Sequence, residues 1–97
     1  GAYQASAARA MITLGAHVAV VVGQRGDKIQ ISMRASRDFH ETTGVHLGRD
    51  IAKPLGEYLH GMGGGHSVSA GVNGVGDIEA SLKRCVRLLK EKLTQIK

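Results

Sequence analysis

Two adjacent stretches in the first third of the chain predict a β-hairpin. Residues Ala16 to Val22 are β-branched and almost wholly apolar, which is typical of a strand buried on both faces. In Lys28 to Arg34, apolar and polar residues alternate strictly, as they do in a strand with one buried face. The residues between them, Gly23 to Asp27, predict a five-residue loop. This hairpin is the best-supported local structure in the sequence.

Three stretches have apolar residues at the three-to-four spacing that is typical of helices. We expect a short helix over Tyr3 to Leu14 and a second helix from His46 to about Leu59. Pro54 lies inside the second helix and should kink it or divide it into two pieces. The clearest helix runs from Asp77 to Ile96, with Asp77 as its N-cap. Its apolar stripe, which is expected to face the core, consists of Ile78, Leu82, Cys85, Val86, Leu89, Leu93 and Ile96.

The segment between the last two helices is rich in glycine. Gly61 to Gly71 contains five glycines in eleven residues and is expected to begin as a loop. It leads into Val68 to Asn73, an alternating stretch of small residues that predicts a third strand. Ala35 to Gly44 is polar and is expected to be irregular. This order predicts an α/β fold in which a small sheet, the hairpin plus a third strand, packs with about three helices in a single compact domain over residues 1–97.

Composition limits the classes of function. Apolar residues make up 42% of the chain, but with one Phe, two Tyr and no Trp the core must be aliphatic, and a base-stacking platform is not expected. The net charge of +5 and a pI near 9.8 favour an anionic partner. A single cysteine, Cys85, excludes an internal disulfide and a multi-cysteine zinc site, which fits a reducing, cytoplasmic setting. No apolar run is long enough to span a bilayer.

Two segments carry groups that can bind phosphate. Glycine lets backbone amides approach a ligand closely, so the amides of Gly63 to Gly65 can line an anion site, to which His66 adds a side chain. At the end of the second strand, Arg34 shares a face with Ser32 and Ser36, and an arginine fork binds phosphate bidentately. The two segments could converge at one edge of the sheet. Alternatively, the glycines form an ordinary surface loop and Arg34 is a solvated strand residue.

Other polar residues give weaker signals. Asp38, His40, Glu41 and His46 lack the i, i+4 histidine pair of a helical zinc site, so we expect a solvated loop there. Cys85 is expected to pack in the core rather than act as a nucleophile. The basic residues of the last helix could follow a nucleic-acid backbone, but a solvated outer face is the simpler interpretation.

The phosphate-binding segments resemble a known family. The similarity rests on Ile31-Ser32-Met33-Arg34-Ala35-Ser36, followed by Gly63-Gly64-Gly65-His66-Ser67-Val68-Ser69-Ala70-Gly71. Together they look like the DHH-associated C-terminal domain of DHH-family phosphoesterases, in the branch of RecJ-like single-strand nucleases. The resemblance covers roughly His17 to Leu93, and the glycine-histidine segment is its specific part. Ser69 stands where the family commonly has alanine.

The resemblance implies a division of labour between two domains. In the family, an N-terminal domain holds a pair of Mn²⁺ or Mg²⁺ ions that activate water for phosphodiester cleavage. This chain has no Asp-His-His run, so no catalytic residue or metal ligand is implied within it. The implied partners are single-stranded DNA or RNA, a short oligonucleotide or nucleotide, the parent's DHH domain, and replication or repair proteins, with no membrane. The implied phosphate-binding residues are Arg34, Ser36, Gly63, Gly64, Gly65, His66, Ala70 and Gly71.

Two rival interpretations stay open. The chain could be a non-catalytic module that binds nucleic acid, a nucleotide or another protein. An alanyl-tRNA-synthetase-type C-terminal module is related in fold, but its glycine loop ordinarily lacks the histidine that stands here at His66.

Overall fold

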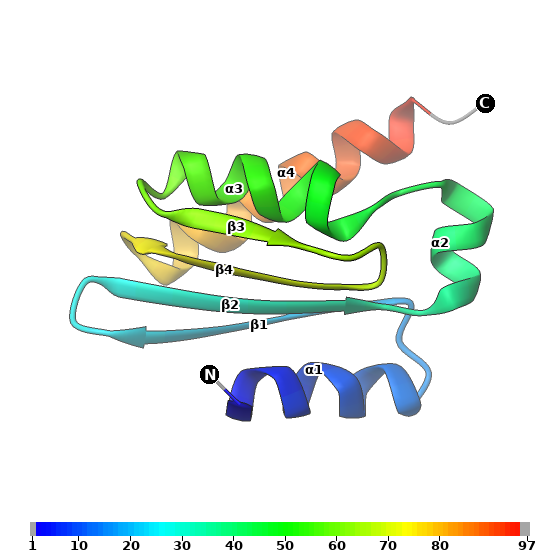
Figure 1. Cartoon of the computed structure of the whole chain (residues 1–97), viewed down its shortest axis with the longest axis horizontal. Coiled ribbons are helices and arrows are strands. Elements are labelled where there is room, and N and C mark those ends of the chain that lie inside the picture. The colour runs from blue at the N-terminus through cyan, green and yellow to red at the C-terminus, as the bar shows by residue number, and fades with distance from the viewer. Residues whose placement is uncertain (1, 96–97) are drawn as a thin grey trace.

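A computed structural model describes residues 2–95 of the chain. In chain order the elements are α1 (Ala2–Thr13), β1 (Val18–Arg25), β2 (Lys28–Ala35), α2 (Arg37–Thr43), the π-helix η1 (Leu47–Ala52), α3 (Lys53–Tyr58), β3 (Met62–Gly65), β4 (Ser69–Val75) and α4 (Ile78–Thr94). The strands form one antiparallel sheet in the order β1-β2-β4-β3 (Figure 1). The expected α/β class and single compact domain are confirmed, with one strand more than the sequence indicated. No helix within residues 2–95 combines the length and apolar character required to cross a bilayer.

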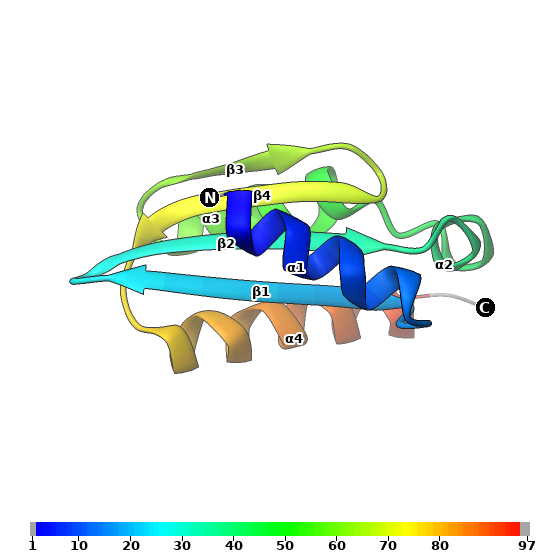
Figure 2. The same cartoon turned by 90° about the horizontal axis from the view of Figure 1, so that it is seen from below.

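The sheet separates two helical layers. α1 lies across β1 and β2 on one face, whereas η1, α3 and α4 cover the other face (Figure 2). The main core lies between the sheet and this second layer, because alternate residues of β2 point toward it. Its largest buried side chains are Ile29, Ile31, Met33, Leu47, Ile51, Leu55, Val72 and Cys85.

The predicted hairpin is confirmed, but its turn is shorter than expected. Arg25 pairs with Lys28, so only Gly26 and Asp27 connect the two strands. Gly26 has φ +63°, a left-handed conformation that glycine adopts without steric cost. A glycine at the first position of a two-residue turn suits the twist of a tight hairpin.

The start of the glycine-rich segment is a strand rather than the expected loop. Met62–Gly65 forms β3, an edge strand that pairs antiparallel with β4. η1 and α3 approach this strand so closely that side chains would not fit between them. A Cβ on Gly63 would overlap the carbonyl oxygen of Ala52, and one on Gly56 would overlap the amide nitrogen of Gly63. The glycines therefore allow the backbones to pack against each other.

The predicted helix from His46 to Leu59 is divided, as its proline indicated. The first part, Leu47–Ala52, has the wider π-helical hydrogen bonding, and α3 follows it directly at Lys53. Pro54 lies in the first turn of α3, at the junction with the π-helical part, and it has no backbone N–H to continue the hydrogen bonding of η1.

The segment from Ala35 to Gly44 is helical, so the prediction of irregular structure was wrong. Ser36 is the N-cap of α2, and its Oγ accepts a hydrogen bond of 3.0 Å from the amide of Phe39. Gly44, with φ +74°, ends the helix in a left-handed conformation. None of the residues of α2 is fully buried, so the helix carries no apolar periodicity that the sequence could reveal.

The side of α4 that faces the core matches the predicted stripe only in part. Cys85 is buried and Leu89 packs against the core as predicted, whereas Leu82 and Val86 of the same stripe are exposed. Ser81, which lies outside the predicted stripe, is also buried. Ile96, which was assigned to the same stripe, lies outside the described residues. The helix itself and its N-cap, Asp77, are as expected.

The helix predicted over Tyr3 to Leu14 is confirmed as α1, which ends at Thr13. Tyr3 and Met11 are exposed, and Ala8 is the buried residue that meets the sheet. α1 lies so close to β1 that a Cβ on Gly23 would overlap the side chain of Gln4. Because the helix is rich in alanine, several of its faces are equally able to pack, and the spacing cannot choose between them.

Candidate anion-binding site

Arg34 lies near the end of β2, on the sheet face that α1 covers. In the antiparallel ladder it stands between Ala19 of β1 and Ser69 of β4. Met33 is buried in the core on the opposite face, so alternation turns Ser32 and Arg34 toward α1.

A small groove of about 190 Å³ lies between α1 and the strands β2 and β4. α1 contributes Ser6 and Arg9, and the strands contribute Ser32, Arg34 and Ser69. The lining thus holds two arginines and three hydroxyl groups, and it contains no carboxylate. We call it the arginine groove; its lining residues are Ala5, Ser6, Arg9, Ser32, Met33, Arg34, Ser69 and Ala70.

The two arginines of the groove are not neutralised by neighbouring residues. Within residues 2–95, the ion pairs are Arg49–Asp50 and Lys83–Glu79, and both lie elsewhere. A guanidinium stays charged at any physiological pH and offers a planar fork of donors, and a serine hydroxyl can also donate. The arginine groove is therefore a cluster of hydrogen-bond donors with positive charge, which is the chemistry that binds phosphate.

The same sheet face continues as a wider trough toward the hairpin turn. Gln30 and Ser32 are successive outward positions of β2, so the two hollows follow one another along the strand. The trough has a volume of about 730 Å³, and Arg25 and Lys28 add two cations to its lining. We call it the hairpin trough; it is lined by Gln4, Gly23, Gln24, Arg25, Lys28, Ile29, Gln30, Asn73, Gly74 and Val75.

Two paired glycines leave the backbone of the sheet accessible beside the arginine groove. Gly64 of β3 pairs with Gly71 of β4. A Cβ on Gly64 would meet no atom within 4 Å, and one on Gly71 would make only an ordinary contact at 3.5 Å. Of the three predicted site amides, those of Gly63 and Gly65 belong to glycines that are needed for packing, and Gly65 also has φ +144°. Of these three glycines, Gly64 is the one at which a side chain would point into open space.

The turn between β3 and β4 presents an exposed side chain at His66. The amide of His66 donates to the carbonyl oxygen of Ser69 at 2.7 Å, and its carbonyl accepts from the amide of Gly48 at 3.0 Å. The amide of Leu47 likewise donates to the carbonyl oxygen of Ser67 at 3.0 Å. The turn is thus fastened to the start of η1 through its backbone, and the imidazole of His66 is not needed to hold it.

The two segments that the sequence singled out meet at the same end of the sheet. Arg34 pairs with Ser69, and the carbonyl of Ser69 accepts the hydrogen bond from His66. Ala70, another predicted site residue, lines the arginine groove itself.

Ser36 has a structural task at this end of the sheet. Its Oγ caps α2, and its amide donates to the carbonyl oxygen of His17 at 2.9 Å. The cap uses an acceptor lone pair of the hydroxyl, so the hydroxyl proton is still available to a ligand. Any contact of Ser36 with phosphate would come in addition to the cap.

Ser6 and Arg9 are groove residues that sequence reasoning missed. They are three positions apart and therefore share one side of α1. A serine and an arginine at this spacing are common on solvated helix surfaces. Only the packing of α1 across β1 and β2 brings them to Arg34, and the sequence carries no local signal for that packing.

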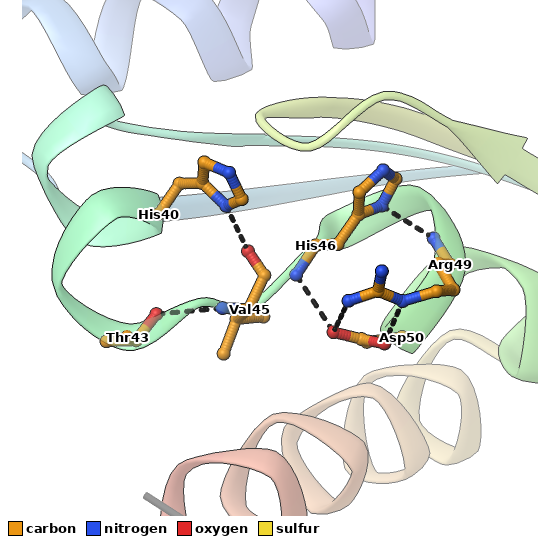
Figure 3. Close-up of polar contacts among 6 residues, drawn as sticks. All are labelled: His40, Thr43, Val45, His46, Arg49 and Asp50. Carbon is orange, nitrogen blue, oxygen red and sulfur yellow. Dashed lines mark hydrogen bonds and ion pairs between the residues drawn. The ribbon is translucent and has the colours of Figure 1, made fainter.

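The histidines between α2 and η1 hold the backbone in place (Figure 3). His40 Nδ1 donates to the carbonyl oxygen of Val45 at 2.8 Å, and His46 Nδ1 accepts from the amide of Arg49 at 2.9 Å. The carboxylate of Asp50 accepts from the amide of His46 at 2.9 Å, and the hydrogen bond from Arg49 lowers the pKa of Asp50. In the part of the chain that the structure describes, no three His, Cys, Asp or Glu side chains are grouped so that they could hold a metal ion.

Comparison with known proteins identifies a fold but no family. No family model matches the chain. An uncharacterized protein of Methanocaldococcus jannaschii is 34% identical over 85 residues, which is 88% of this chain and 26% of that protein. The chain thus spans about a quarter of the length of this curated relative. The C-Ala domain of Aquifex aeolicus alanyl-tRNA synthetase matches with a TM-score of 0.69 at 23% identity, over 94% of this chain and 78% of the solved chain, so the two share a fold.

This structural match overturns the resemblance to the DHH-associated domain, which rested on Ile31–Ser36 and Gly63–Gly71. The RecJ-like nuclease function that this resemblance implied, in which a phosphate is held against a metal centre in a DHH domain, is therefore also wrong. The reason is physical: Gly63 is required where the strand meets the carbonyl of Ala52. A glycine motif of this kind reports the packing of the fold rather than phosphoesterase chemistry.

Proposed function

We propose that this domain is a non-catalytic module that binds nucleic acid, and RNA above all, through its phosphates. The observation that carries the proposal is the arginine groove, in which Arg9 and Arg34 share a small polar hollow with three serines and no carboxylate. The fold supports it, because the structural relative is a domain of an alanyl-tRNA synthetase. The net charge of +5 agrees with an anionic partner of this kind.

The α1 face of the sheet suits a nucleic-acid backbone better than it suits bases. The arginine groove and the hairpin trough together display Arg9, Arg34, Arg25 and Lys28 along one face. Between the cations, the hairpin trough carries the amide side chains of Gln4, Gln30 and Asn73, and within residues 2–95 no aromatic side chain lines either hollow. Phosphate contacts position a strand without reading its sequence. Binding should therefore be sensitive to salt and tolerant of sequence.

A binding titration that is monitored by fluorescence anisotropy tests the proposal. The whole chain is titrated with a labelled, unmodified tRNA transcript and with single-stranded DNA of the same length, at several salt concentrations. Each phosphate that a Lys or Arg neutralises contributes about −0.7 to −0.9 to the slope of log binding constant against log salt concentration. The four cations of the α1 face therefore predict a slope of about −3. The tRNA should bind more tightly than the DNA.

Substitutions locate the binding face. The double variant Arg9→Ala/Arg34→Ala should bind the tRNA about tenfold or more weakly and lose about 1.5 from the salt slope. Arg87→Ala/Lys90→Ala removes the same charge from α4, in the layer behind the sheet, and serves as the matched control. Equal losses in the two double variants would mean diffuse attraction by net charge and would contradict the proposal.

A further inference from the structure

α4 packs Ser81, Cys85, Leu88 and Leu89 against the core and leaves a second set of aliphatic side chains outside. Ser81 and Cys85 are buried against the core. A helix that only had to cover its own core would not need a second aliphatic line on its outer side. The exposed side chains lie on one line over about four turns. We call this line the α4 stripe; it consists of Ile78, Leu82, Val86 and Leu93, which are 36–47% exposed.

Basic side chains run alongside the α4 stripe. Lys83, Arg87 and Lys90 recur at spacings of four and three residues, so they form a ridge on one flank, which we call the basic ridge. Of these three, Lys83 pairs with Glu79 at 3.2 Å in an exposed i, i+4 ion pair of the kind that contributes little to stability. A hollow of about 540 Å³ lies between the stripe and the ridge, lined by Leu82, Lys83, Val86, Arg87, Lys90 and Glu91.

We propose that the α4 stripe and the basic ridge together dock an acidic amphipathic helix of a partner protein. The apolar face of such a helix would lie on Leu82 and Val86, which is the helix-in-groove mode of recognition. Carboxylates on its flank would meet the basic ridge, and this charge complementarity sets orientation and association rate. The surface lies in the layer opposite α1, so it can be occupied while nucleic acid is bound at the arginine groove (Figure 2). The proposal does not depend on the proposed function.

A second copy of the chain is a poorer occupant. α4 carries five basic and two acidic residues, so two α4 helices packed together would bring like charges into contact. An anionic membrane is also a poorer occupant. α4 has no Trp, Tyr or Phe to sit at a lipid interface, and one of its sides is already covered by the domain.

Two matched peptides test the proposal in solution. The first is a labelled helical peptide of about 18 residues with leucines at three-to-four spacing and glutamates on both flanks. In the second, lysines replace the glutamates. The whole chain should bind the glutamate peptide about tenfold or more tightly than the lysine peptide. Val86→Ser, at the centre of the α4 stripe, should weaken that binding about fivefold or more without changing the circular dichroism spectrum.

Charge reversal tests whether the basic ridge selects the partner. The triple variant Lys83→Glu/Arg87→Glu/Lys90→Glu should prefer the lysine peptide. The matched control, Arg9→Glu/Arg25→Glu/Lys28→Glu, makes the same change in net charge on the opposite face and should keep the original preference. All six side chains are exposed, so both variants should remain folded.

Several results would overturn the proposal. Equal affinity for the two peptides, or an unchanged preference in the ridge variant, would show that the ridge does not select a partner. Binding to phosphatidylserine vesicles without binding to the glutamate peptide would make the surface a membrane contact. A dimer in sedimentation experiments that Val86→Ser abolishes would make a second copy the occupant.

Discussion

Arg34 of β2 and Ser69 of β4 are Cα partners in the antiparallel ladder, and both line the groove that α1 completes with Arg9. Arg34 thus belongs to an inner strand of the sheet, with a hydrogen-bonded strand on each side, and not to a loop. A side chain on a rigid element loses less freedom when it binds a ligand. In the proposed function, this pairing would hold the guanidinium of Arg34 in position before a phosphate binds.

Replacing His66 with alanine should weaken tRNA binding about two- to fivefold and leave stability unchanged within about 0.5 kcal/mol. The backbone of residue 66 makes the hydrogen bonds to Ser69 and Gly48, and alanine keeps them. Anisotropy gives the affinity, and urea denaturation gives the free energy of unfolding. An unchanged affinity would remove His66 from the site, and a large loss of stability would mean that the imidazole has a structural role.

Gly63→Ala and Gly64→Ala should differ sharply although the residues are adjacent. A Cβ at Gly63 would overlap the carbonyl oxygen of Ala52, so this variant should lose about 2 kcal/mol or more of stability. A Cβ at Gly64 meets no atom within 4 Å, so that variant should stay within about 0.5 kcal/mol of the parent. Urea denaturation of both variants makes the comparison. Similar losses at the two positions would contradict the close packing of β3 against η1 and α3.

Substitution can separate the capping role of Ser36 from its proposed contact with phosphate. Ser36→Ala removes the cap of α2 and should cost about 1 kcal/mol in the free energy of unfolding. Ser36→Asp keeps a capping acceptor, so its stability should match that of the parent, but it places a carboxylate beside the proposed phosphate site. Nucleic-acid binding should therefore fall in Ser36→Asp while its thermal midpoint does not. If Ser36→Asp binds as tightly as the parent chain, Ser36 lies outside the site.

Stability should decline at high pH because of Cys85. Burial raises the pKa of its thiol from 9.0 to about 11, so the unfolded chain ionises first. The contribution of Cys85 to folding is full below pH 9 and is lost as the pH rises from 9 toward 11, by an amount on the order of 2 kcal/mol. Cys85→Ala should be less stable at neutral pH and should show a flatter decline over the same range. Parallel pH profiles for the two proteins would contradict the burial of the thiol.

Local patterns in the sequence were enough to predict the elements that have strong periodicity. Strict alternation identified Lys28 to Arg34 as a strand, and an N-cap with a long apolar repeat identified α4. β3 was missed because glycines at 63 to 65 have no side chains to alternate. α2 was missed because it buries no residue and so shows no apolar face.

The sequence predicted only some residues of the candidate site, because packing between distant segments brings the site together. The sequence singled out Arg34 and His66, which end up at the same end of the sheet. It did not single out Arg9, because the spacing of α1 could not show which side of an alanine-rich helix meets the sheet. The function drawn from the glycine motif was wrong for a related reason. Glycines such as Gly63 are fixed by backbone packing, which proteins with different functions can share.

The most direct test of the account is an NMR titration of the ¹⁵N-labelled chain with the tRNA transcript at moderate salt. Binding at the α1 face predicts shift changes centred on Arg9, Ser32, Arg34, Ser69 and the Gly64–Gly71 pair, with α4 unaffected. The same changes should be absent in Arg9→Ala/Arg34→Ala at equal RNA concentration. Changes confined to α4, or no changes at all, would contradict nucleic-acid binding at the arginine groove.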